Sequence, residues 1–207
     1  MTLIASRVAS RALLCMTVAA MLSACTLFPD RPANRLFQLP ASTVEESITG
    51  NKPFSTTLRF VTPLAEGPVD SSRILVKPEG NEIKAYQGAR WSNKSPILVR
   101  DQLIDAFRRD GRFAGIITGT SPARSDLTMA GELSAFQSEY QDGMPVALIR
   151  LDLHLIDERT RNTLASKRFE YRHPARGEQV EAIVEAFGEA SNALAHEVIR
   201  WAIEQRP

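Results

Sequence analysis

The segment from residue 126 to residue 171 alternates apolar and polar side chains with a period of two, and this pattern constrains the fold more than any other feature. Its middle part places leucine and isoleucine between Arg150, Asp152 and His154, which predicts a strand with one buried face and one face toward water or a partner. Strands that follow one another through tight turns, such as Gln141-Asp142-Gly143, pair antiparallel. The sequence therefore predicts an antiparallel meander with strands near 127–135, 146–157 and 163–171.

Two amphipathic helices are predicted beside this meander. The first begins at Ser95, whose hydroxyl is expected to cap the free amides, and Pro96 occupies the first helical position, where its missing N–H costs nothing. Gly111 ends this helix. The second covers 177–205 and carries an apolar stripe at three- and four-residue spacing. We expect the stripe to pack in the core; a partner or oligomer surface is the alternative.

Short apolar segments between breaker residues complete the predicted fold. Five further strands are expected, at 35–39, 56–61, 74–77, 82–86 and 113–117. The predicted fold class is an α/β (α+β) sandwich, in which a mixed, largely antiparallel sheet has two amphipathic helices packed on it. With 43% apolar residues, a chain of 207 residues can build the core of one domain. A formal net charge of +1 is too small for an electrostatic nucleic-acid binder, so we expect no nucleic-acid partner.

The first 25 residues determine the expected compartment. An apolar run at 12–22 follows Arg7 and Arg11, has the length of a signal peptide, and is too short for a permanent membrane span, which needs about 20 apolar residues. The run ends in Leu22-Ser23-Ala24-Cys25, which resembles the bacterial lipobox, whose cysteine receives a lipid and becomes the new N-terminus. An ordinary secretory signal followed by a chance cysteine is the alternative.

The interpretation of this motif as a lipobox predicts the domain organisation. Residues 1–24 are the predicted signal peptide, 25–34 the lipidated cysteine and tether, and 35–207 a single domain. The mature chain keeps Cys25 as its only cysteine, so we expect no disulfide and no cofactor apart from the covalent lipid. In lipoproteins an Asp after the cysteine resembles an inner-membrane retention signal. Thr26 therefore implies, by resemblance, the inner leaflet of the outer membrane, facing the periplasm.

No motif of known chemistry occurs in the chain. P-loop, dinucleotide-binding, zinc-protease and nucleophile-elbow patterns are absent, and the histidines lack ligand-spaced partners, so neither a catalytic nor a metal site is predicted. Asp152 and His154 resemble two members of a hydrolase triad, but a solvated strand face is the preferred interpretation. A basic cluster consists of Arg150, Arg168, Arg172 and Arg176. This cluster could contact an anionic headgroup or an acidic partner, but a dispersed charged surface is the preferred interpretation.

The central stretch from Ile83 to Pro96 contains the most specific pattern in the chain: a strand that ends in Tyr86, the pair Arg90-Trp91, and a helix that begins at Pro96. With the leucine spacing of that helix and the Gly-Arg-Phe that follows it, the stretch resembles the signature of the ABC-type transport auxiliary lipoprotein family, including its paraquat-inducible members. We expect the rings to anchor the strand-to-helix corner, with a partner interface as the alternative role for these signature residues.

The resemblance also implies a fold and a role. Members of the family are outer-membrane lipoproteins that serve intermembrane lipid transport systems, built from a mammalian-cell-entry (MCE) domain protein and an ABC permease with its ATPase. Their fold resembles the N-terminal domain of the translocation protein TolB. The expected function is therefore non-enzymatic docking of an MCE assembly at the outer membrane, with homo-oligomer formation an open alternative. Two other functions stay open: an assembly lipoprotein for lipopolysaccharide or outer-membrane barrels, and a periplasmic hydrolase.

Overall fold

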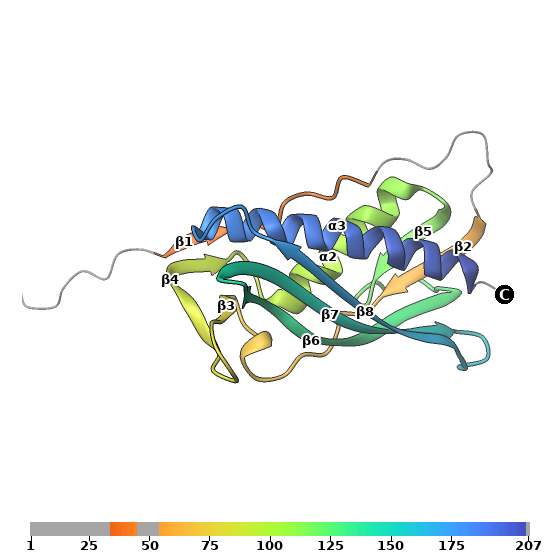
Figure 1. Cartoon of the computed structure of the whole chain (residues 1–207). Coiled ribbons are helices and arrows are strands. Elements are labelled where there is room, and N and C mark those ends of the chain that lie inside the picture. The colour runs from red at the N-terminus through yellow and green to blue at the C-terminus, as the bar shows by residue number, and fades with distance from the viewer. Residues whose placement is uncertain (1–33, 45–53, 206–207) are drawn as a thin grey trace, which may run out of the picture. The chain divides into compact units, whose positions relative to one another are not determined.

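The computed structural model describes residues 34–44 and 54–205, which all belong to the compact unit that begins at Asn34 (Figure 1). The predicted signal peptide and Cys25, and nearly all of the predicted tether, lie outside the described residues. Helices and strands follow in the order β1 (Arg35–Phe37), β2 (Phe54–Phe60), η2 (Gly67–Val69), β3 (Arg73–Lys77), β4 (Lys84–Trp91), α2 (Ser95–Asp110), β5 (Phe113–Thr118), β6 (Leu127–Gln141), β7 (Met144–Asp157), β8 (Thr163–Pro174) and α3 (Val180–Glu204).

All eight described strands form one mixed sheet, organised around β6. Along one edge β6 pairs antiparallel with β7 over nearly its full length, and β7 pairs antiparallel with β8. Along its other edge β6 pairs parallel with two short strands placed end to end, β2 near Leu127 and β3 near Gln137. An isolated bridge between Leu64 and Glu132 continues the pairing between them. The sheet continues from β2 to β5, and from β3 through β4 to β1.

The predicted meander of β6, β7 and β8 is confirmed, and its first turn has the conformation that its residues favour. Asp142 and Gly143 have φ angles of 51° and 77°, as a two-residue hairpin turn of type I′ requires. β6 is longer than predicted because a register shift between Leu133 and Ala135 absorbs the break in the alternation and lets the strand continue to Gln141.

Helices α2 and α3 pack against each other, and α3 lies across β7 and β8 (Figure 1). The predicted end of α2 is confirmed, because Gly111 adopts a left-handed φ of 73° and its N–H binds the Phe107 carbonyl. The predicted cap at Ser95 is wrong. Lys94 occupies the N-cap without a side-chain bond, and the buried Ser95 hydroxyl instead donates to the Ser71 carbonyl at 3.3 Å, because the loop before β3 packs against the start of the helix.

The apolar stripe of α3 packs in the core, as predicted. Its Phe187 ring meets Phe136 of β6 and Trp91 of β4, with centroid separations of 4.5 and 5.4 Å. All three side chains are at most 1% exposed. Buried aromatic rings in contact contribute more than their buried area alone. This aromatic cluster therefore joins the long helix to the centre of the sheet and to the strand that leads into α2.

Truncation of Phe187 tests whether this cluster stabilises the fold. We expect Phe187→Ala to lower the free energy of unfolding in urea by about 3–5 kcal/mol, because it leaves a cavity between α3 and β6. Leu64→Ala is the matched control, since Leu64 is 75% exposed, and it should change stability by less than about 0.5 kcal/mol. Equal losses in the two variants would contradict the assignment of the core.

Candidate functional site

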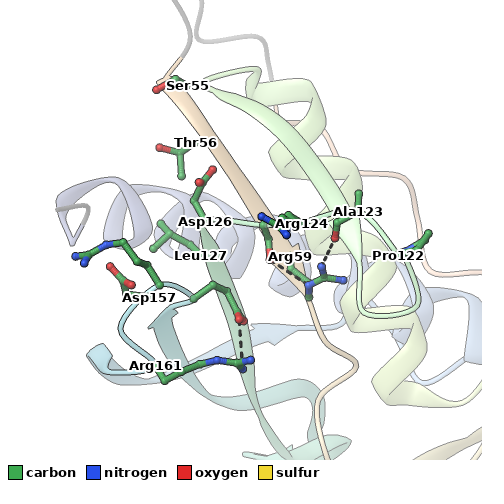
Figure 2. Close-up of a pocket in the computed structure, with 13 residues that line it drawn as sticks. Ser55, Thr56, Arg59, Pro122, Ala123, Arg124, Asp126, Leu127, Asp157 and Arg161 are labelled. Atoms are coloured by element: carbon green, nitrogen blue, oxygen red, sulfur yellow. Dashed lines mark hydrogen bonds and ion pairs between the residues drawn. The ribbon is translucent and has the colours of Figure 1, made fainter.

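Two large hollows lie at opposite ends of β6. The first has a volume of about 740 Å³, and Leu127 at the start of β6 lines it (Figure 2). The second has a volume of about 820 Å³, extends along β3 and β4, and includes Tyr140 near the end of β6. At about 3.3 Å per residue the two ends of this strand are roughly 40 Å apart. The two hollows are therefore separate candidate sites.

The first hollow is built around Arg59 of β2, which holds the loop between β5 and β6. Its guanidinium donates to the carbonyls of Ser121 at 2.9 Å and Thr118 at 3.3 Å, and to the Ser125 hydroxyl at 3.1 Å. It also donates to the carbonyl of Ala123 (Figure 2). These four bonds engage four of the five N–H donors of the guanidinium. Arg59 therefore has a structural role in positioning the loop.

The carboxylates of the first hollow also hold local backbone. Asp126 accepts the Thr57 N–H at 2.7 Å. Asp157 accepts the Thr160 N–H at 2.7 Å, and that backbone bond lowers the pKa of Asp157. Glu158 forms an ion pair with Arg161 at 3.4 Å (Figure 2). The hollow thus contains charges of both signs, its carboxylates are engaged, and it shows no nucleophile paired with a base among its lining residues.

The second hollow has a different electrostatic character. Its lining includes three cationic side chains, Arg73, Lys84 and Arg90, and it includes no aspartate or glutamate. Tyr86 contributes a half-buried ring whose hydroxyl lies 3.0 Å from the Ser138 hydroxyl, and burial raises the pKa of this phenol. Tyr86 is therefore a neutral hydrogen-bonding group at the wall of a basic hollow.

The four signature residues divide between this hollow and the core. Tyr86 and the exposed Arg90 line the hollow, whereas Trp91 and Pro96 are buried. The indole N–H of Trp91 has no hydrogen-bond partner among the described residues, so packing against Phe136 and Phe187 positions it. The predicted end of the strand near Tyr86 is wrong, because β4 continues through Gly88, with a φ of 67°, to Trp91. For Arg90, the possible interface role stays a prediction.

Three of the four arginines in the predicted basic cluster form ion pairs with acids of the β6–β7–β8 meander. Arg150 binds Glu170 at 2.6 Å, and Arg168 holds both oxygens of Asp152 at 2.7 and 3.1 Å. Arg172 binds Glu139 and Glu170, both at 3.0 Å. The geometry supports the preferred interpretation of a charged solvent face. Arg176 lies apart, in a smaller hollow of about 430 Å³ that Glu185 and Glu189 also line.

His154 has a partner that sequence reasoning missed. Its Nδ1 lies 2.7 Å from the hydroxyl of Ser166, directly opposite on β8. A hydrolytic triad would also need a carboxylate on the histidine, but both oxygens of Asp152 are bound to Arg168. Ser166 is exposed in the middle of a strand. The three side chains therefore form cross-strand surface pairs and do not form a triad; only the β7–β8 register could have revealed Ser166.

A network of three polar side chains joins α3 to β8. Glu197 accepts a bond from Lys167 Nζ at 2.7 Å and another from the Tyr171 hydroxyl, and these bonds lower the pKa of Glu197. Burial, together with the bond and charge of Glu197, raises the pKa of Tyr171 to about 12. All three members are occupied with one another across the helix–sheet contact. The network therefore fastens α3 to β8.

The described residues hold neither a metal-binding group nor a membrane-spanning helix. In residues 34–44 and 54–205, His, Cys, Asp and Glu side chains form no cluster of three or more suited to an ion. Within the same ranges, α2 and α3 included, a helix long and apolar enough to cross a bilayer does not occur.

Comparison with known proteins identifies both a family and a fold. The family of ABC-type transport auxiliary lipoprotein components matches residues 37–199. The chain is similar to the crystal structure of protein XCC0632 from Xanthomonas campestris, of the family DUF330, with 24% identity, a TM-score of 0.75, and coverage of 83% of this chain and 95% of that one. A second crystal structure, of an uncharacterised protein, has 12% identity and a TM-score of 0.65, with coverage of 82% and 99%. No curated protein matches in sequence.

These likenesses confirm the predicted fold class, a mixed sheet with two helices. Because the sequence identities to these two structures lie below 25%, the structures support the fold of this chain and not its function. The family match over most of the chain supports an auxiliary role for this protein, as a lipoprotein component of a transport system.

Titration of the tyrosines tests the network beneath α3. A Tyr171 pKa raised above its ordinary value of 10.0 stabilises the fold below pH 10, and this contribution is lost as the pH rises toward 12. Replacing Glu197 by Gln removes the negative charge that opposes ionisation. We therefore expect Glu197→Gln to lower the pKa of Tyr171 toward 10, measured by the ultraviolet absorbance of the phenolate, with Tyr171→Phe assigning the transition.

The exposed Glu204 on the same helix provides the control, and Glu204→Gln should leave the Tyr171 transition in place. An unchanged Tyr171 transition in Glu197→Gln would show that the carboxylate does not contact the phenol in solution.

Proposed function

The chain belongs to the ABC-type transport auxiliary lipoprotein family, and from this membership we propose that it is a non-enzymatic outer-membrane lipoprotein that docks the MCE assembly of an intermembrane lipid transport system. The observation that carries the proposal is the family match over residues 37–199, joined in one chain to a lipobox that ends at Cys25. The lipid positions the domain, and the domain supplies the contact surface for the periplasmic assembly.

The length between the anchor and the fold supports this position. Cys25 precedes Asn34, the first described residue, by nine residues, which reach at most about 30 Å when fully extended. Several acyl chains at roughly 0.8 kcal/mol per buried methylene hold such a cysteine in the bilayer permanently. A folded domain on so short a tether stays at the surface of the leaflet that holds the lipid.

The described surfaces fit a docking role better than a catalytic one. The arginines of the β7–β8 face are paired with acids, and Asp126 and Asp157 of the first hollow accept backbone N–H groups. His154 and Ser166 form a bond without the carboxylate of a triad. Hydrolysis therefore has no support from the geometry of these residues, and the assembly of lipopolysaccharide or barrel proteins has no specific observation in its favour.

The experiment is affinity purification of the full-length, lipidated protein in mild detergent, followed by mass spectrometry of the proteins that accompany it. We expect an MCE-domain protein and its ABC permease. The control is Cys25→Ser, which keeps the folded domain but removes the site of lipid attachment. It should recover at least about tenfold less of the same partners, because the anchor raises the effective concentration of the domain at the membrane.

Two results would overturn the proposal. Recovery of a barrel-assembly or lipopolysaccharide-assembly complex in place of the MCE protein would assign the protein to that alternative. Equal recovery of MCE partners with Cys25→Ser would show that lipid anchoring does not position the docking domain.

A further inference from the structure

The β3–β4 ladder places two arginines directly opposite each other. Arg73 and Arg90 are cross-strand partners in this antiparallel pair. Side chains at such positions lie about 5 Å apart at their Cβ atoms, and like charges there destabilise the sheet. Both residues are exposed, and neither guanidinium forms an ion pair or hydrogen bond with the described residues. The fold thus keeps an unfavourable pair of cations without a compensating acid.

Two arginines of β7 and β8, by contrast, lie opposite acids. On β7 and β8, Arg150 lies opposite Glu170, and Arg168 lies opposite Asp152; both pairs are ion-paired. The hollow around Arg73 and Arg90 has no acidic side chain in its lining, although Lys84 at its other end binds the nearby Glu82 at 2.8 Å. Glu178 also lies near enough for its charge to act on Tyr86, but neither Glu82 nor Glu178 is bound to Arg73 or Arg90. Two unpaired guanidinium groups in a hollow whose lining includes no acid are suited to an external anion. Their planar forks match the oxygens of a phosphate.

The surroundings of the hollow indicate where that anion lies. Asn34, nine residues from Cys25, lines the hollow, and β1 places Leu36, which is 71% exposed, beside Arg90. Further large apolar side chains are exposed at the β3–β4 turn and at the tip of the β6–β7 hairpin, namely Ile83, Tyr140 and Met144. Exposed apolar and aromatic side chains beside unpaired arginines are typical of a surface that rests on an anionic bilayer.

We propose that this hollow binds the phosphate of an anionic phospholipid headgroup in the leaflet that holds the lipid anchor, with Arg73 and Arg90 as its ligands. Tyr86 and Tyr140 line the same hollow, where an aromatic ring with a polar end suits the membrane–water interface. The inference rests on the lipid anchoring of the proposed function. It adds a second, non-covalent contact, which orients the domain on the membrane.

The test is native mass spectrometry of the full-length, lipidated protein in detergent micelles that contain phosphatidylglycerol at increasing concentration. We expect one phospholipid to be retained per chain. The double substitution Arg73→Gln with Arg90→Gln should weaken this retention about thirtyfold, from the loss of two cationic contacts to an anionic lipid. The same spectra show the acyl chains on Cys25 directly, so a failure of the anchor is distinguishable from a failure of the headgroup site.

A matched control removes two charges from the other end of β6. Arg124 and Arg159 are exposed and line the first hollow, where acids are present. Arg124→Gln with Arg159→Gln should change retention by less than about twofold, because charges that far away are screened. Equal weakening in the two double variants would indicate general charge attraction and would overturn the proposal, as would no weakening in Arg73→Gln with Arg90→Gln.

Two further arms identify the source of the anion. Inorganic phosphate replaces the lipid in a parallel titration, and we expect it to bind far more weakly; equal affinity would assign the site to a free anion. The same arginine variant is also used in affinity purification. If it loses a protein partner while lipid retention is unchanged, the ligand is an acidic protein surface and the lipid assignment is wrong.

Stability measurements separate a binding site from a structural one. Since Arg73 and Arg90 repel each other in the ladder, Arg73→Gln with Arg90→Gln should unfold at the same temperature as the unaltered protein or at a higher one in lipid-free detergent. A lower unfolding temperature would mean that the arginines stabilise the sheet, and the proposed role as ligands would fail.

Discussion

The hydrogen-bond ladders on the two edges of β6 organise the whole described domain. One edge pairs with β7 from Leu127 to Gln141, and the other pairs with β2 and β3 through the bridge at Leu64. Gly131 lies where β6 approaches β7 most closely, since a Cβ atom there would lie 1.9 Å from the Asp152 carbonyl oxygen. Only a residue without a side chain permits this approach. Strand β6 therefore positions the two hollows, the charged face of β7 and β8, and the surface on which α3 packs.

The elements that local patterns encode could be predicted from the sequence. Alternation with a period of two yielded the β6–β7–β8 meander, and the helical stripe identified the buried face of α3, because each of these signals lies within a few neighbouring residues. The parallel pairing of β2 and β3 with β6 could not be predicted in the same way. It joins segments separated by about 60 residues or more, and no pattern within either segment specifies the partner. The cap at Ser95 failed for a similar reason, since a loop distant from the helix start competes for its hydroxyl.

In the candidate site too, contiguous motifs could be predicted from the sequence, whereas contacts between distant segments could not. Cys25 follows from a contiguous motif, and the signature from Tyr86 to Pro96 follows from a contiguous stretch. By contrast, the opposition of Arg73 and Arg90 depends on the register of a hairpin that contains an irregularity, and the hollow combines residues from the three strands β3, β4 and β6 with the residue before β1. The arginines of the predicted basic cluster on β7 and β8 form ion pairs with acids of the same meander. Counting charges along the sequence therefore does not identify the unpaired guanidinium groups of Arg73 and Arg90. The pairing of strands identifies them.

The contact between the two ends of the domain has a consequence for how the protein is made. Pro40 lies against Gly188, where a Cβ atom would come within 2.7 Å of the proline ring, and the Thr43 N–H binds the Asn192 side chain across 149 positions of sequence. The segment from 38 to 44 thus packs on α3, which lies far later in the sequence. During synthesis this segment has no surface to pack on until α3 has been made, so the contact between them forms late. Chaperones that hold nascent chains would find this N-terminal segment accessible until then.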